Sequence, residues 1–237
     1  MRTNLFLSLF SSFLLTCAFY PIQFSLLACV ALVPFFYLLE RTSARGAVLW
    51  GYLTGLLVSS VMVQWSSLAT VRDNVIFIFV SPLYLAVYAL THHSLLKRSR
   101  WVVTLLVPLL WGAKEILQFF TNLGLWMTSL GWTQSSLLTI FSKHFFLAGP
   151  VLAVWVVFLN MLFLSLCKSF VQRKNVLVPT VAFVVVLAVP WGWQWLHGGW
   201  GNRAGQHFGL HRLSVDQPPV IESFYNMAQP VLASHYH

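Results

Sequence analysis

Long apolar runs recur along almost the whole of this 237-residue chain, and they limit its possible folds more than any other feature. Seven of them approach or reach the roughly 17 to 25 residues that a helix needs to cross the hydrocarbon core of a bilayer. They span residues 3–20, 21–39, 47–70, 75–96, 101–120, 145–167 and 176–196. Charged residues make up 8% of the chain, whereas a soluble domain carries about 25%. We therefore predict an all-α integral membrane protein with about seven transmembrane helices.

The charged residues between the runs predict which way the chain crosses the membrane. The formal net charge is +9, and in a membrane protein such an excess reports loop orientation and does not indicate a nucleic-acid partner. With the N-terminus in the cytoplasm, nine cations lie on the inner side: Arg2, Arg41, Arg45, Lys97, Arg98, Arg100, Lys168, Arg173 and Lys174. Four lie on the outer side: Arg72, Lys143, Arg203 and Arg212. Because inner loops favour Lys and Arg, we predict a cytoplasmic N-terminus and, after an odd number of spans, an exterior tail.

The first run has a competing interpretation as a signal peptide. Arg2 precedes an apolar stretch, and the residues before Cys17 weakly resemble a lipoprotein cleavage box. Thr16 stands where a small Gly, Ala or Ser is usual, and another apolar run follows at once. We therefore expect the segment to be retained, although insertion of both of the first two runs stays open.

Neither cysteine nor histidine forms a recognisable metal-site pattern. Cys17, Cys29 and Cys167 lie inside or at the end of apolar runs, without metal-ligand spacing. His207 and His211 are one helical turn apart, but their glycine-rich surroundings favour a flexible linker. The sequence also has no protease or phosphate-loop motif and no evident internal repeat. We predict no metal and no cofactor.

The stretch at the end of the fifth run carries polar groups where lipid normally excludes them. Glu115 lies fourteen residues beyond Trp101, or about 21 Å along a helix, in the outer third of a roughly 30 Å core. It shares a helix face with Trp111 and Gln118, whereas Lys114 points about 100° away. A carboxylate at this depth must be paired, hydrated or neutral. Two interpretations stay open: a polar anchor at the mouth of a lipid-facing cavity, or a hydrogen-bonding post for the following loop.

Residues 122–142 mix apolar residues with Thr, Ser, Asn, Gly and Gln. This mixture is typical of an interfacial or re-entrant segment, which we place on the outer side. Trp126 and Trp132 are expected at the level of the lipid headgroups.

Several motifs together resemble the apolipoprotein N-acyltransferases of bacterial inner membranes. The fifth-helix signature of that family is a Trp followed by Glu-x-Leu-Arg, then Gly-Phe-Pro-Trp, then Gly-Tyr-Ser-Gln. The corresponding residues here are Trp111, Glu115-Ile-Leu-Gln118, Gly124-Leu-Trp126-Met127 and Gly131-Trp132-Thr133-Gln134. Weaker similarities lie in the first helical hairpin at residues 18–34 and in the third helix at Gly51, Gly55 and Trp65. Gly149 and Asn160 continue the pattern in the helix that follows the fifth-helix signature.

Three departures from the signature concern its polar and aromatic positions. Gln118 replaces the family's Arg, Trp126 occupies the proline position, and Met127 stands where a Trp is expected. Exchanging a guanidinium for a neutral amide is expected to weaken contact with an anionic headgroup.

The resemblance implies a membrane bundle that positions lipid substrates beneath a periplasmic nitrilase-like domain with a Glu, Lys and Cys triad. Forty-one residues follow Leu196, and none of them is Cys. We expect residues 1–196 to form the membrane domain and residues 197–237 to form a periplasmic tail containing Gly and His, a remnant start of the nitrilase-like domain. The chain is then not expected to transfer acyl groups alone, and whether it is an enzyme stays open. Three explanations of the missing catalytic domain stay open: the chain is a truncated copy, a subunit of a split enzyme, or a repurposed scaffold.

The expected site shapes a lipid-binding surface and contains no catalytic residue. Its residues are Glu115, Gln118, Gly124, Trp126, Gly131, Trp132 and Gln134. The implied partners are phospholipid, a diacylated lipoprotein and a separate nitrilase-like subunit, and the implied location is the bacterial inner membrane. A non-enzymatic lipid-binding scaffold or a transporter-like membrane protein is the alternative.

Overall fold

The computed structural model describes residues 2–19, 24–65, 71–120, 129–134, 145–173, 176–189 and 192. Over these ranges the chain is helical and contains no strand. It divides into two compact units, Met1–Pro190 and Trp191–His237. Gly192 is the one described residue of the second unit, so the tail predicted at 197–237 lies outside the described residues. All structural statements below concern the first unit.

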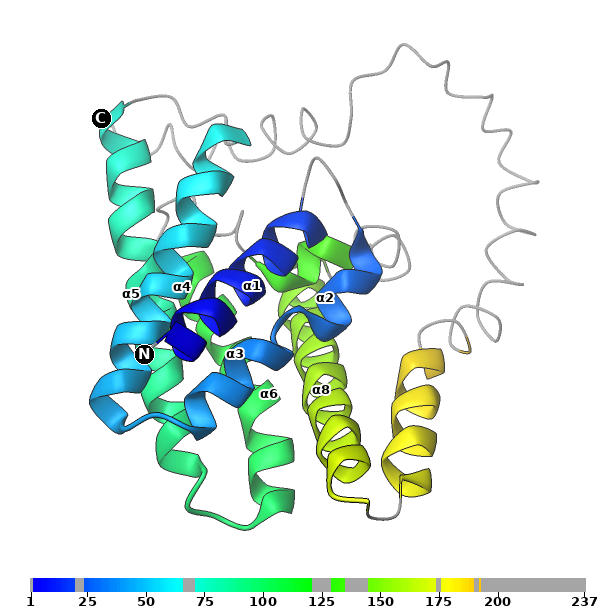
Figure 1. Cartoon of the computed structure of the whole chain (residues 1–237). Coiled ribbons are helices and arrows are strands. Elements are labelled where there is room, and N and C mark those ends of the chain that lie inside the picture. The colour runs from blue at the N-terminus through cyan, green and yellow to red at the C-terminus, as the bar shows by residue number, and fades with distance from the viewer. Residues whose placement is uncertain are drawn as a thin grey trace, which may run out of the picture. The chain divides into compact units, whose positions relative to one another are not determined.

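The helices follow one another in the order shown in Figure 1. They are α1 (Arg2–Ala18), α2 (Ser25–Ala31), α3 (Val33–Glu40), α4 (Ala44–Met62), the 3₁₀ turn η1 (Val63–Trp65), α5 (Val71–Leu95), α6 (Arg100–Phe120), the 3₁₀ turn η3 (Leu130–Gln134) and α8 (Phe145–Val171). A further apolar helix covers Leu177–Val189.

Each predicted apolar run coincides with helical structure, which confirms the all-helical fold. Within the described part, the helices Val71–Leu95 and Gly149–Val171 are long and apolar enough by themselves to cross a membrane. Two apolar helices are weak evidence for a membrane protein, so the count of seven spans stays a prediction.

The second run differs from its prediction, because it forms two helices that meet at Leu32 rather than one. Pro34 lacks the backbone N–H that a continuous helix needs, and α3 carries it in its first turn. Asn160 of α8 bridges the break. Its Oδ1 accepts a hydrogen bond from the Leu32 N–H at 2.8 Å, and its Nδ2 donates to the Ala28 carbonyl at 2.7 Å. In an unbroken helix the Leu32 N–H would bond the Ala28 carbonyl directly. Here the Asn160 amide bonds both groups instead.

Two glycines let α4 approach α5 closely. A Cβ atom on Gly51 would lie 2.7 Å from the Ala89 Cβ, and one on Gly55 would lie 2.8 Å from the Pro82 Cα. The two glycines are four residues apart and share one face of α4. Such pairs of small residues are typical of closely packed helices in membranes.

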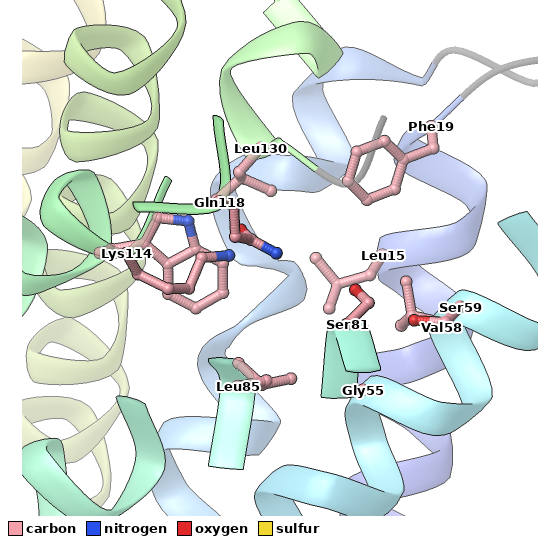
Figure 2. Close-up of a pocket in the computed structure, with 11 residues that line it drawn as sticks. Leu15, Phe19, Gly55, Val58, Ser59, Ser81, Leu85, Lys114, Gln118 and Leu130 are labelled. Carbon is pink, nitrogen blue, oxygen red and sulfur yellow. The ribbon is translucent and has the colours of Figure 1, made fainter. Parts of the chain in front are cut away.

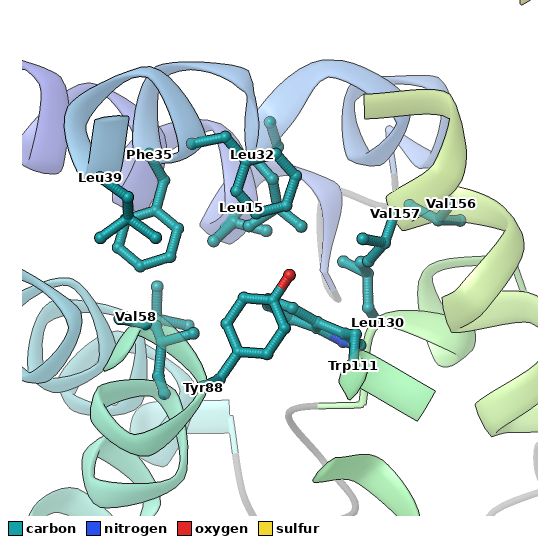
Figure 3. Close-up of a cluster of buried hydrophobic side chains, with 14 of the residues drawn as sticks. Leu15, Leu32, Phe35, Leu39, Val58, Tyr88, Trp111, Leu130, Val156 and Val157 are labelled. Carbon is teal, nitrogen blue, oxygen red and sulfur yellow. The ribbon is translucent and has the colours of Figure 1, made fainter. Parts of the chain in front are cut away.

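Aromatic rings connect α3, α5 and α6 at the centre of the core. The rings of Tyr88 and Trp111 meet edge to face, with centroids 4.7 Å apart and planes at 78°. His92 lies one turn further along α5, and its ring meets Phe36 edge-on at 5.0 Å. Figure 3 shows Tyr88 and Trp111 surrounded by aliphatic side chains from several helices. This packing fixes the orientation of the Trp111 indole, which takes part in the site described next.

Large apolar side chains also cover outward faces of the helices. Phe6 and Phe13 of α1, Val87 of α5 and Leu109 of α6 are all exposed. Exposed phenylalanine, valine and leucine on several helices suit contact with lipid acyl chains better than contact with water.

Candidate functional site

Glu115 is the centre of a buried hydrogen-bond cluster near the C-terminal end of α6. Its side chain is 4% exposed. Oε1 accepts hydrogen bonds from the Trp111 Nε1 at 2.9 Å and from the Leu130 N–H at 2.6 Å. Oε2 accepts one from the Ser129 hydroxyl at 2.5 Å. Three donors offset much of the cost of removing a carboxylate from water.

These three donors come from two separate parts of the chain. Trp111 precedes Glu115 by four residues, so the helix itself places both side chains on one face. Ser129 immediately precedes η3 and Leu130 begins it, fourteen and fifteen residues after Glu115. Glu115 therefore ties η3 to α6, which is the geometry of the hydrogen-bonding post, while its role as a lipid-facing anchor stays a prediction.

The 3₁₀ turn η3 is buried between α2, α6 and α8. The Thr133 hydroxyl donates to the Leu130 carbonyl at 2.7 Å within the turn. Gln134 Nε2 donates to the Ser25 carbonyl of α2 at 2.8 Å. A Cβ atom on Gly131 would overlap the backbone of Gly149 in α8. The turn is thus held by hydrogen bonds on two sides and by a glycine contact on the third.

A small cavity of about 40 Å³ lies between α1, α4, α5, α6 and η3 (Figure 2). Its apolar wall is formed by Leu15, Phe19, Val58, Leu85 and Leu130. Its polar side chains are Ser59, Ser81, Lys114 and Gln118. The volume suits a few water-sized groups and is too small for an acyl chain.

Lys114 faces this cavity rather than Glu115. Its Nζ lies 4.3 Å from the centroid of the Trp111 ring, which is a cation–π contact. The edge of the same ring donates to Glu115 through Nε1. The Trp111 ring therefore contacts both charged groups: its edge donates a hydrogen bond to Glu115, and its face lies against the Lys114 ammonium group.

The structure brings four of the seven expected site residues into one region. Glu115 and Gln134 stabilise η3 from its two ends, Gly131 packs in its middle, and Gln118 lines the neighbouring cavity with Leu130. Of the other three, Gly124 and Trp126 lie outside the described residues, as does the side chain of Trp132.

Sequence reasoning did not assign Ser129, Ser59, Ser81 or Lys114 to the site. Lys114 was recognisable as a charge inside an apolar run. The three serines had no signal, because a lone serine is common in any helical or interfacial segment and its partner is set by tertiary packing.

Comparison with known families gives a match over the first part of the chain. The family model of the apolipoprotein N-acyltransferase N-terminal domain matches residues 11–142, more than half of the chain. This region contains Glu115, η3 and all the cavity residues named above. A search of curated proteins finds no match. The family and the two long apolar helices together indicate a membrane protein. By the extent of this match, the chain belongs to the family defined by the apolipoprotein N-acyltransferase N-terminal domain.

Proposed function

We propose that this chain is the membrane part of an apolipoprotein N-acyltransferase system and holds lipid substrates for the N-acylation of bacterial lipoproteins. Family membership associates the chain with this reaction. The observation that carries the proposal is the buried Glu115 cluster, which fixes η3 beside a cavity containing Lys114 and Gln118. Such a rigid polar site inside an otherwise apolar bundle suits the headgroup region of a lipid.

The proposed setting is the bacterial inner membrane, crossed by seven helices with the N-terminus in the cytoplasm. The excess of cations in the loops assigned to the inner side supports this orientation. The exposed apolar side chains on α1, α5 and α6 support contact with lipid. In this orientation α6 runs outward, so that Glu115 and η3 lie toward the periplasmic leaflet. Residues 122–142 then form an interfacial segment on that side.

We assign the bundle a presenting role and the covalent step to a nitrilase-like domain, as the family resemblance implies. Transfer of an acyl group to an amine needs an activated nucleophile, a base and oxyanion donors. In this proposal phospholipid donates the acyl group, a diacylated lipoprotein receives it, and the nitrilase-like domain is a separate subunit. The residues of the site shape the lipid surface and take no part in bond formation.

Mass spectrometry of lipoprotein N-termini tests this proposal. The host is a strain that lacks other N-acyltransferases, and it expresses the chain alone, a nitrilase-like acyltransferase domain alone, or both together. We expect triacylated N-termini only when both are present. Triacylation with the chain alone would contradict the presenting role. Diacylated N-termini in all three strains would contradict the link to N-acylation and favour a lipid-binding scaffold or a transporter-like protein.

A further inference from the structure

Three polar side chains that line the cavity have no hydrogen-bond partner among the described residues of the protein. They are Ser59 of α4, which is 1% exposed, Ser81 of α5, which is 6% exposed, and Lys114 of α6. Lys114 has its cation–π contact with Trp111, but no carboxylate of the described residues lies within 4 Å of its Nζ. Buried polar groups in folded proteins are almost always hydrogen-bonded, to the protein or to ordered water. Three such groups facing one cavity therefore indicate a ligand inside it.

The ligand must be able both to accept and to donate hydrogen bonds. Figure 2 shows Lys114 and Gln118 on one side of the cavity and Ser59 and Ser81 on the opposite side. The ammonium group of Lys114 only donates, whereas the serine hydroxyls and the Gln118 amide each offer an acceptor oxygen. An anion would accept from Lys114 but could not donate to those oxygens. Water does both.

The size of the cavity also favours water. Its volume is about 40 Å³, and a buried water molecule needs about 10 to 15 Å³ of such space. The cavity therefore has room for about two or three water molecules. Its four polar side chains, on opposite sides, provide the several hydrogen-bond partners that a buried water requires. A larger polar ligand does not fit.

We propose that this cavity is a binding site for ordered water, whose molecules hydrate the Lys114 ammonium group and connect it to the hydroxyls of Ser59 and Ser81. The water joins α6 to α4 and α5 through hydrogen bonds. It also keeps a charged Lys114 against the face of Trp111, whose edge donates to Glu115, and Glu115 fixes η3. Internal water thus contributes to holding η3 in place, while lipids remain outside the cavity.

X-ray hydroxyl-radical labelling of the purified full chain in a neutral detergent tests this site. Irradiation converts water to hydroxyl radicals where the water lies, and mass spectrometry then measures the oxidation of each side chain. Trp111 lines the cavity and is 3% exposed, whereas Trp50 of α4 is 8% exposed and does not line it. We expect Trp111 to be oxidised several-fold faster than Trp50, although it is the less exposed of the two. A radical scavenger in the solvent is expected to leave this difference intact, because bound water generates its radicals beside the Trp111 ring.

Two substitutions of Ser81 separate the hydroxyl from the space around it. Ser81→Val is expected to slow the oxidation of Trp111 toward the rate of Trp50, because the variant loses a hydroxyl and its larger side chain occupies part of the cavity. Ser81→Ala removes the hydroxyl without filling the cavity and is expected to lower the Tm, because a water-mediated hydrogen bond is lost. Ser94→Ala is the matched control on the same helix. The Ser94 hydroxyl is exposed and bonds the Thr91 carbonyl of α5, so its removal is expected to leave the Tm and the oxidation of Trp111 unchanged.

The opposite results would overturn the water site. Equal oxidation of Trp111 and Trp50 would do so in the wild-type protein alone, and loss of the difference with a scavenger would show that the radicals come from bulk solvent. An unchanged rate at Trp111 in folded Ser81→Val would also contradict bound water. A Tm that is unchanged or raised in Ser81→Ala would show that the hydroxyl has no water partner, since removing an unpartnered buried polar group does not destabilise a protein. None of these results bears on the N-acylation of lipoproteins, so the water site and the proposed function fail separately.

Discussion

Glu115 and Asn160 are buried polar side chains, and each has hydrogen-bond partners one helical turn away and others far away in the sequence. Glu115 accepts three hydrogen bonds and fixes the start of η3. Asn160 completes the hydrogen bonding of the α2–α3 break at Leu32. In an apolar environment, a backbone or side-chain group without a partner costs about 1 to 3 kcal/mol. Both residues are therefore expected to matter for stability whatever lipid the protein binds.

Glu115→Gln is expected to lower the free energy of unfolding by about 2 to 3 kcal/mol. The amide keeps the shape of the side chain, but its NH₂ group faces a donor where a carboxylate oxygen accepted a hydrogen bond. Denaturant titration of the purified protein in detergent measures the change. Glu40→Gln is the matched control: its carboxylate forms a partly exposed ion pair with Lys168, and its loss is expected to cost less than about 1 kcal/mol. Equal losses in the two variants would show that the Glu115 cluster is not a structural post.

Asn160→Leu is expected to destabilise the junction between α2 and α3 at Leu32. The leucine preserves volume but leaves the Leu32 N–H and the Ala28 carbonyl without the amide that bridges them, at a cost of about 2 to 4 kcal/mol. Hydrogen exchange of residues 28–36, followed by mass spectrometry, is expected to accelerate in the variant. Ser60→Ala is the control, because the Ser60 hydroxyl bonds the Leu56 carbonyl of its own helix. Exchange that accelerates equally in both variants would contradict this account.

At the scale of the elements, glycines set how closely neighbouring backbones approach. Gly51 and Gly55 face α5, and Gly131 of η3 faces Gly149 of α8. In both places a side chain would meet backbone atoms, which cannot move without shifting a whole helix or turn. These contacts bring η3 and α5 to the positions from which Leu130 and Ser81 line the cavity.

Gly55→Ala is expected to destabilise the protein by about 1 to 3 kcal/mol, because the new methyl group meets the Pro82 backbone. Gly149→Ala is the matched control in another helix. The atom nearest to its new methyl group would be the Ser129 hydroxyl oxygen at 3.7 Å, which is an ordinary van der Waals contact, and alanine favours a helix by about 1 kcal/mol over glycine. Gly149→Ala is therefore expected to be close to neutral. Thermal unfolding in detergent ranks the two variants, and the reverse order would contradict the packing described for α4 and α5.

At the scale of the whole molecule, the family and the apolar helices indicate a membrane protein, and the charged residues predict its orientation. The two long apolar helices, Val71–Leu95 and Gly149–Val171, both lie within one unit, Met1–Pro190. The direction of crossing follows from the distribution of Lys and Arg.

Single-cysteine labelling tests the predicted orientation. Cys17, Cys29 and Cys167 are first replaced by alanine, and a cysteine is then introduced at Arg72 or at Arg98, both of which are exposed. A membrane-impermeant maleimide is expected to label Arg72→Cys in intact spheroplasts and Arg98→Cys only after lysis. Labelling of Arg98→Cys in intact spheroplasts would reverse the topology and place the Glu115 cluster toward the cytoplasm.

The sequence by itself determined the helical composition, the approximate helix boundaries and the placement of Trp111 and Glu115 on one helix face. These features depend on apolar run length and on the four-residue spacing of a helix face, which are local properties. It also indicated the family, because the motifs around Glu115 and Gly131 are contiguous.

Only the tertiary structure decided which distant groups complete these local features. The Leu32 break is satisfied by Asn160, 128 residues away, and the second and third donors to Glu115 come from the turn after α6. Lys114 was visible as a charge in an apolar run, but its place over Trp111 and in the cavity depends on how α1, α4, α5 and α6 pack. The physical reason is that run length and helix periodicity act between near neighbours in the chain, whereas a buried polar group is satisfied by whichever partner the packed helices bring within about 3 Å.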